Sequence, residues 1–272
     1  MEKEIERCFL EGPGSIPTIK PEIGNLIGVV VPHAGYIFSG RIAAYSFHKI
    51  AEEGFADVFI ILGPNHTGVG SGVSVYPSGK WRTPLGEIPI DTILVKKIAG
   101  GIIDIDENAH RYEHSIEVQL PFLQYISNDR EFSIIPICMA MQDIDTAREV
   151  GEKIAEVIKE DPRRIIIIAS SDLSHEGFMY GRIPPNGVNV DEYVRERDQL
   201  AIKEIKDLNP DGLINTVYKN GLTMCGYGPV ASLLYAAKKL GVTKAELLKY
   251  GTSYEVSSDD NACVGYSAFA IY

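Results

Sequence analysis

Histidines at the ends of apolar runs are the first place in this sequence where chemistry can be expected. His33, His66 and His175 each lie a few residues beyond a strand-like apolar run. Neutral imidazole binds Zn, Cu, Fe and Ni, and it is also a common general acid or base near neutral pH. One such histidine is usually a hydrogen-bonded loop residue, but three favour a common metal or acid–base centre.

Asp172 lies three residues before His175, in the segment Ser-Asp-Leu-Ser-His. Its carboxylate could fix the orientation of an imidazole or bind a metal ion itself. The alternative is a local turn in which the aspartate side chain binds its own backbone. Spacing alone leaves both interpretations open.

A second polar segment, His110 to Leu120, leads into an amphipathic stretch. His114 and Glu117 are three residues apart, so on a helix they would share a face and could act as a proton-transfer pair. The alternative is a helix cap with a surface salt bridge. His110 has a weaker claim to function, and His48, inside an amphipathic helix, is expected to be structural.

Cys225 precedes the last long helix of the chain, where the backbone dipole favours a thiolate. It is therefore the cysteine with the best claim to reactivity or metal binding. Cys138 and Cys263 lie in apolar strands, and Cys8 lies near the N-terminus. The cysteines are widely spaced and form no C-x-x-C pair, which is typical of a reducing cytoplasm.

The elements that must position these residues alternate along the chain, as expected for crossover-connected parallel strands. We predict an α/β layered fold with a central, largely parallel or mixed sheet flanked by helices. The expected strands are Leu26–Val31, Val58–Leu62, Gly72–Tyr76, Phe132–Ile137, Arg164–Ala169, Glu246–Gly251 and Cys263–Tyr272. The expected helices are Ser39–Glu52, Ser115–Ile126, Ile144–Lys159, Val190–Leu208 and Gly228–Leu240. Ser39 and Asp143 are expected N-caps, and Gly241 is expected at a helix end.

In such folds ligands bind beyond the carboxyl ends of the strands, which places the three histidines at one edge of the sheet. The length of 272 residues is compatible with one domain, 1–272. A net charge of −11 disfavours nucleic acid as a partner, since phosphates would be repelled. No apolar run is long enough to cross a membrane, and no leader segment opens the chain, so a cytoplasmic location is expected.

Five motifs together resemble the MEMO family: Pro32-His33-Ala34-Gly35-Tyr36, Gly63-Pro64-Asn65-His66, Glu113-His114-Ser115-Ile116-Glu117, Ser171-Asp172-Leu173-Ser174-His175 and Cys225-Gly226. They occur in order from about Leu26 to the C-terminus. The resemblance implies a fold similar to that of the class III extradiol dioxygenases, with a metal pocket where those enzymes hold non-haem Fe(II).

The resemblance also implies site residues. His33, His66 and Cys225 are the implied metal ligands, with Asp172 and His175 in the same pocket and His114 as a further motif residue. A thiolate in place of a carboxylate is a softer ligand, which favours copper, zinc or thiolate-bound iron. Relatives are linked to receptor signalling, to phosphotyrosine-peptide recognition and to iron or copper handling. Others are encoded beside AMMECR1-like and radical-SAM proteins, which are implied functional partners.

Three functions follow as hypotheses. The first is a metal-dependent redox enzyme that uses iron or copper, with His114, Asp172 and His175 moving or holding protons. The second is a non-enzymatic protein that binds metal or a peptide, for which Tyr36, Trp81, Arg82 and Arg111 supply aromatic and cationic groups. The third is a zinc hydrolase, although the sequence contains no H-E-x-x-H pattern.

Overall fold

The computed structural model describes residues 1–272, and its centre is a mixed nine-stranded sheet. Eight strands follow the order β10-β11-β1-β8-β2-β7-β3-β6, and β9 pairs with β11 at one end. A separate hairpin is formed by β4 and β5. The strands are β1 (Gly28–Val31), β2 (Val58–Pro64), β3 (Val73–Val75), β4 (Lys80–Thr83), β5 (Gly86–Pro89), β6 (Asp104–Ile105), β7 (Ser133–Met139), β8 (Ile165–Ser170), β9 (His175–Glu176), β10 (Ala245–Thr252) and β11 (Cys263–Ile271).

The middle of this sheet is parallel. β1, β8, β2 and β7 run in the same direction as neighbours, whereas β11 and β3 flank them antiparallel. All residues of β1, β2 and β8 are buried, as expected for strands covered on both faces. Because the carboxyl ends of β1, β2 and β8 meet at one edge, the segments that begin after Val31, Pro64 and Ser170 start side by side.

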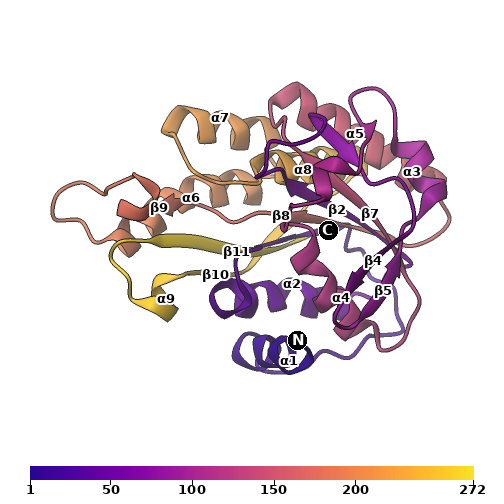
Figure 1. Ribbon diagram of the computed structural model, residues 1–272, viewed down its shortest axis with the longest axis horizontal. Helices are drawn as coiled ribbons and strands as arrows, with labels where there is room; N and C mark the ends of the chain where they lie inside the picture. Colours follow the sequence, from indigo (N-terminus) through magenta and orange to yellow (C-terminus); the bar gives the residue numbers. More distant parts are fainter.

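Helices cover both faces of the sheet (Figure 1). α1, α2 and α4 lie on one face, and α5, α6, α7 and α8 lie on the other, with α3 beside α5. The helices are α1 (Glu2–Glu11), α2 (Arg41–Glu52), α3 (Thr92–Ile98), α4 (Leu120–Ser127), α5 (Ile144–Glu160), α6 (Val190–Lys206), α7 (Pro210–Asn220), α8 (Tyr227–Lys239) and α9 (Tyr254–Ser257). None of them combines the length and apolar character that crossing a bilayer requires.

The prediction of a layered α/β fold with a central mixed sheet is confirmed. All seven expected strands are present to within a few residues. The expected helix at Ser115 begins later: a 3-10 turn covers Glu117–Gln119, and α4 starts at Leu120, where Pro121 is in its first turn. The helices α1, α3, α7 and α9, the short strands β6 and β9 and the β4–β5 hairpin were not predicted.

The expected helix caps are partly correct. Asp143 caps α5, because its side chain accepts hydrogen bonds from the backbone N–H groups of Asp145 and Thr146. Gly241 follows the C-cap of α8 with φ +83°, a conformation that favours glycine. Ser39 is wrong as an N-cap: a π-helical turn, Tyr36–Gly40, precedes α2, and the Ser39 hydroxyl instead donates to the Ala34 carbonyl.

Candidate metal centre

His33, His66 and Cys225 come together at the carboxyl edge of the parallel strands. One ligand atom from each lies within 4.8 Å of the other two. The His33 and His66 ring centroids are 5.2 Å apart, and Cys225 Sγ lies 3.2 Å from His33 Nε2. Two ligands on one tetrahedral Zn²⁺, for comparison, lie roughly 3.5 Å apart. The set is therefore compact enough for side-chain adjustments alone to close it around one ion.

The proton on the His33 imidazole is placed by a buried hydrogen-bond network. His33 Nδ1 lies 2.8 Å from Ser170 Oγ, which donates its own proton to the Ser115 carbonyl at 2.7 Å and accepts from Gln119 Nε2 at 3.0 Å. A hydroxyl has only one proton to give, so His33 Nδ1 must be the donor. His33 Nε2 is thereby left as a lone pair that faces Cys225.

His66 is oriented in the same sense by a carboxylate. Its Nδ1 lies 3.0 Å from Glu113 Oε1, and a carboxylate only accepts, so His66 Nε2 is also the free nitrogen. Glu113 is buried and further accepts backbone N–H bonds from His66, His114 and Ser115. A carboxylate behind a ligand imidazole is the usual way in which proteins fix such a ligand.

Burial and polar contacts shift the pKa values of these groups in opposite directions. Burial alone would raise the pKa of Glu113, but the bonds from His66 and the backbone outweigh it and hold that pKa well below its usual range. The Glu113 carboxylate in turn raises the pKa of His66. His33 is almost fully enclosed, and this burial lowers its pKa to about 4 despite the nearby Asp172 carboxylate. His33 is therefore neutral at pH 7, as a ligand must be.

Cys225 differs from the sequence-based expectation. It lies two residues before α8, but burial raises the pKa of its thiol well above its usual range, and the Asp172 carboxylate adds to this effect. Desolvation outweighs the helix dipole here, because the dipole contributes only about 1 kcal/mol. The prediction of a dipole-stabilised thiolate is therefore wrong. Metal binding would have to displace the thiol proton.

His114 lies at the exposed rim of the same cluster. Its ring is 5.0 Å from that of His66 and 5.6 Å from that of His33, between centroids. The expected pairing with Glu117 does not occur, because this segment is not helical at His114, and the charged neighbour is instead Glu113, 3.6 Å away. His66, Glu113 and His114 form a second compact set of possible ligands that shares His66 with the first.

Asp172 and His175 are not members of the compact His33–His66–Cys225 set, although the backbone of Asp172 contacts Cys225 Sγ. Asp172 Oδ1 accepts the backbone N–H of His33 at 2.7 Å, so it holds that backbone rather than an imidazole. His175 Nδ1 donates to the carbonyls of Leu173 and Thr223, which leaves its Nε2 free. Both residues line a cavity of about 230 Å³, together with Phe38, Tyr180 and others.

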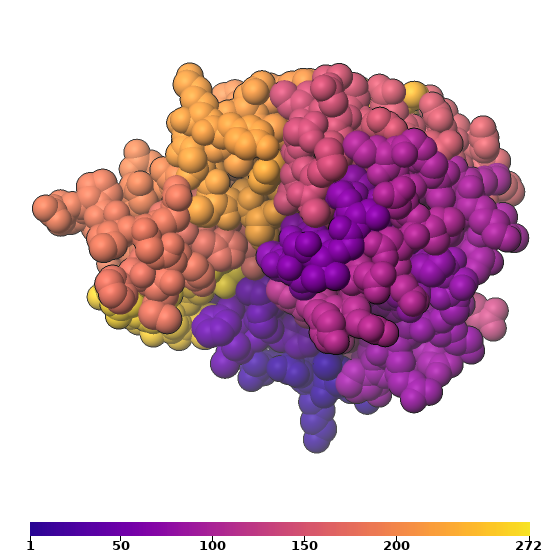
Figure 2. Space-filling view, turned by 45° about the horizontal axis from the view of Figure 1, so that its top comes forward, coloured from indigo at the N-terminus to yellow at the C-terminus, as the bar shows by residue number.

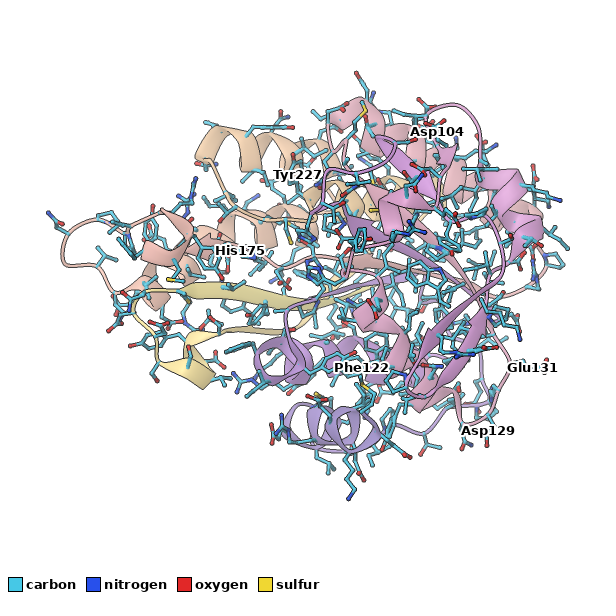
Figure 3. The ribbon with its side chains drawn as sticks, viewed as in Figure 1. Asp104, Phe122, Asp129, Glu131, His175 and Tyr227 are labelled. Atoms are coloured by element: carbon cyan, nitrogen blue, oxygen red, sulfur yellow. The ribbon has the colours of Figure 1, made fainter.

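The cluster and this cavity join distant parts of the chain. Figure 3 marks His175 in β9 and Tyr227 at the start of α8, the helix that Cys225 precedes. Figure 2 shows the first half of the chain, from indigo to magenta, meeting the orange C-terminal part along a seam. The histidines at positions 33, 66 and 114 come from the first part, and Asp172, His175 and Cys225 come from the later part.

Of the four residues that the peptide-binding hypothesis requires, three line the same cavity and one lies elsewhere. Trp81, Arg82 and Arg111 line one cavity, which three glutamates share. Tyr36 is elsewhere: its hydroxyl donates to the Val118 carbonyl, and its ring packs against Phe122. Three carboxylates around two guanidinium groups disfavour a phosphate-bearing ligand there.

Sequence reasoning missed the residues that orient the imidazoles. Glu113 is part of the motif that contains His114. Its bond to His66 joins residues that are 47 positions apart, so the sequence spacing does not indicate it. Ser170, Gln119 and Ser115 are common polar residues, and nothing in their sequence positions indicates contact with His33. Only the tertiary structure brings them to His33.

Comparison with known proteins places these features in a family. The family model described as "Memo-like protein" matches residues 1–270. A MEMO1 family protein of Methanosarcina barkeri is 45% identical over 271 residues, covering 100% of this chain and 93% of the relative. One from Methanopyrus kandleri is 44% identical over 274 residues and covers 98% and 92%.

A solved structure resembles the fold at much lower sequence similarity. It is the crystal structure of the uncharacterized protein JW3007 from Escherichia coli K12, with a TM-score of 0.58 and 12% identity. The match covers 91% of this chain and 100% of that one. At this identity the likeness concerns the fold alone.

Proposed function

The chain belongs to the Memo family, and from this premise and the converging donors at the strand ends we propose that it is a metal-dependent redox enzyme that uses iron or copper. The observation that carries the proposal is the pair of imidazoles whose Nδ1 atoms are both engaged. Each is left with Nε2 available, beside one thiol. Such a set of donors suits a transition metal, whereas Mg²⁺ and Ca²⁺ prefer oxygen.

The types of donor atom in the ligand set limit which metals can bind. His33, His66 and Cys225 would bind it, and their mixed nitrogen and sulfur donors fit copper, iron or zinc. Iron or copper would supply the one-electron chemistry that amino-acid side chains lack. Three protein ligands leave room for a substrate, as they do at catalytic zinc sites.

The remaining residues would act on the substrate. The cavity of about 230 Å³ that Asp172 and His175 line adjoins His33, and its other walls include Phe38 and Tyr180. These walls suit a small, partly apolar molecule. His175 Nε2 could take a proton from it, because the two carbonyls at Nδ1 fix the tautomer. His114, on the exposed side of the cluster, could exchange protons with solvent.

An optical measurement on the Cys225→Ser variant tests this proposal. Protein produced with iron or copper available should retain that metal and, once oxidised to Fe(III) or Cu(II), show a visible thiolate-to-metal charge-transfer band, which the variant should lose. Cys138→Ser, a buried cysteine outside the cluster, is the matched control and should keep the band. The proposal fails if the wild type retains neither metal and Cys225→Ser is indistinguishable from it. Retained zinc with chelator-sensitive ester hydrolysis would favour the hydrolase instead.

A further inference from the structure

A second cavity is lined in part by Glu113. Its volume is about 270 Å³, room for about nine water molecules. Tyr76, Trp81 and His110 supply three aromatic walls, and Glu107, Arg111 and Glu117 supply charge. No residue of the His33–His66–Cys225 set takes part in it.

The three aromatic rings form a rigid corner. Tyr76, Trp81 and His110 contact one another edge to face, with centroids 5.4 to 5.8 Å apart. Such packing fixes the ring orientations and leaves ring faces for an apolar or aromatic group. Neither the Trp81 indole N–H nor the Tyr76 hydroxyl has a hydrogen-bond partner in the chain.

His110 contributes an unused acceptor. It is buried, and its Nε2 donates to the Ser74 carbonyl at 3.2 Å, so Nδ1 carries a lone pair. This Nδ1 has no hydrogen-bond partner. Burial lowers the pKa of His110 to about 4, so the lone pair persists at neutral pH. A buried acceptor without a donor costs stability, and this one is closed to solvent, so His110 contributes to the cavity through its ring.

Some of the charged side chains around the cavity are unpaired, and these carry both signs. Arg82 is engaged by Glu87 at 2.8 Å, and the Glu113 carboxylate is saturated by His66 and backbone N–H groups. Arg111, Glu107 and Glu117, in contrast, form no salt bridge. A purely anionic ligand would meet the two carboxylates, and a purely cationic one would meet the guanidinium group.

We propose that this cavity binds a free amino acid with an aromatic side chain. Its carboxylate would pair with Arg111, its ammonium group would face Glu107 and Glu117, and its ring would pack against the aromatic walls formed by Trp81, Tyr76 and His110. The volume of about 270 Å³ is sufficient for one such molecule. The site would operate whether or not a metal ion is bound at His33, His66 and Cys225.

Three matched probes test this assignment by calorimetry on the metal-free, full-length protein. L-phenylalanine carries both charges, phenylacetate lacks the ammonium group, and phenethylamine lacks the carboxylate. We expect saturable binding of one L-phenylalanine per chain, about tenfold tighter than that of either single-charge probe. Equal binding of all three probes would overturn the assignment, as would no saturable binding of L-phenylalanine.

Variants locate the binding. Arg111→Gln should weaken L-phenylalanine binding about tenfold, because it removes the partner of the carboxylate. Arg130→Gln replaces another exposed arginine without a salt bridge, outside this cavity, and should leave binding unchanged. Both substitutions are at exposed positions, and unchanged thermal unfolding would verify the fold. Binding that survives Arg111→Gln, or that both variants weaken equally, would contradict the proposal.

Discussion

At the scale of single residues, the chemistry of the cluster depends on which nitrogen of each imidazole is free. In His33 the Ser170 hydroxyl occupies Nδ1, and in His66 the Glu113 carboxylate does so. Both rings therefore present Nε2 without any need to change tautomer. A preset tautomer reduces the cost of ordering the ligands when an ion binds.

Replacing Glu113 with glutamine tests this role. The amide keeps the size of the side chain but has one acceptor oxygen in place of two, so His66 and the backbone donors cannot all be satisfied. We expect metal affinity to fall about 10- to 100-fold, measured by competition with a chromogenic chelator. The free energy of unfolding should also fall, by about 1–3 kcal/mol.

Glu117→Gln is the matched control, because this neighbouring glutamate does not contact His66. It should leave metal affinity unchanged. An equal loss of metal affinity in both variants would mean that the net negative charge near the site, and not the bond to His66, determines the affinity.

The sequence contains enough information to select His33, His66 and Cys225, since strand ends, a helix start and family motifs mark them. It does not contain a visible signal for the partners of the imidazoles. His114 and Glu117 have the spacing of a helical pair, but the chain turns irregularly before α4, so Glu113 and not Glu117 meets His114. Local spacing predicts contacts only where the local structure is regular.

At the scale of elements, the site depends on how closely β2 approaches the segment that carries Glu113. A Cβ atom on Gly63 would lie 2.4 Å from Ser115 Oγ and 2.7 Å from Ile116 Cγ1. The absence of a side chain at Gly63 therefore lets Ser115 donate to the Pro64 carbonyl at 3.0 Å. This contact holds the segment that carries Glu113 against the end of β2, two residues before His66.

Gly63→Ala should push these two segments apart. We expect a loss of about 1–3 kcal/mol in the free energy of unfolding, the usual cost of overpacking, measured by urea titration. Metal affinity should fall as well, because the His66–Glu113 bond would lengthen. Gly79→Ala, at a site with open space around it but φ +93°, controls for a purely local backbone cost. Metal affinity reduced equally in both variants would contradict this explanation.

Several of the elements that were not predicted are short, although α1 and α7 have ten and eleven residues. The β4 sequence Lys-Trp-Arg-Thr has only one large apolar residue, and β4 pairs with β5 alone. α7 follows α6 after a short turn, and its Pro210 indicates a helix start only once a helix is expected there. The long apolar strands, by contrast, were predictable because burial on both faces demands them.

At the scale of the whole molecule, one buried carboxylate links three parts of the fold. Asp198 in α6 accepts the backbone N–H of Ser174 at 2.9 Å and the Tyr250 hydroxyl of β10 at 2.8 Å. Burial raises the pKa of Asp198 to about 7, although these hydrogen bonds oppose the shift. Glu176, nearby, raises it further.

This shift predicts a pH-dependent stability. Because the folded state binds the Asp198 proton more tightly than the unfolded state, this group's stabilising contribution is complete below about pH 4 and declines as the pH rises to about 7. The decline is at most about 4 kcal/mol. Asp198→Asn should remove this slope in urea titrations between pH 4.5 and 8. Glu196→Gln, an exposed position in the same helix, should retain it, and an unchanged slope in Asp198→Asn would refute the assignment.

The most direct test of the central claim is elemental analysis of anaerobically purified protein. Wild type should contain one iron or copper ion per chain. His33→Ala and His66→Ala should each lose it while circular dichroism and thermal unfolding show an intact fold. Metal that persists in both folded variants, or a wild type that holds no stoichiometric metal, would contradict the account.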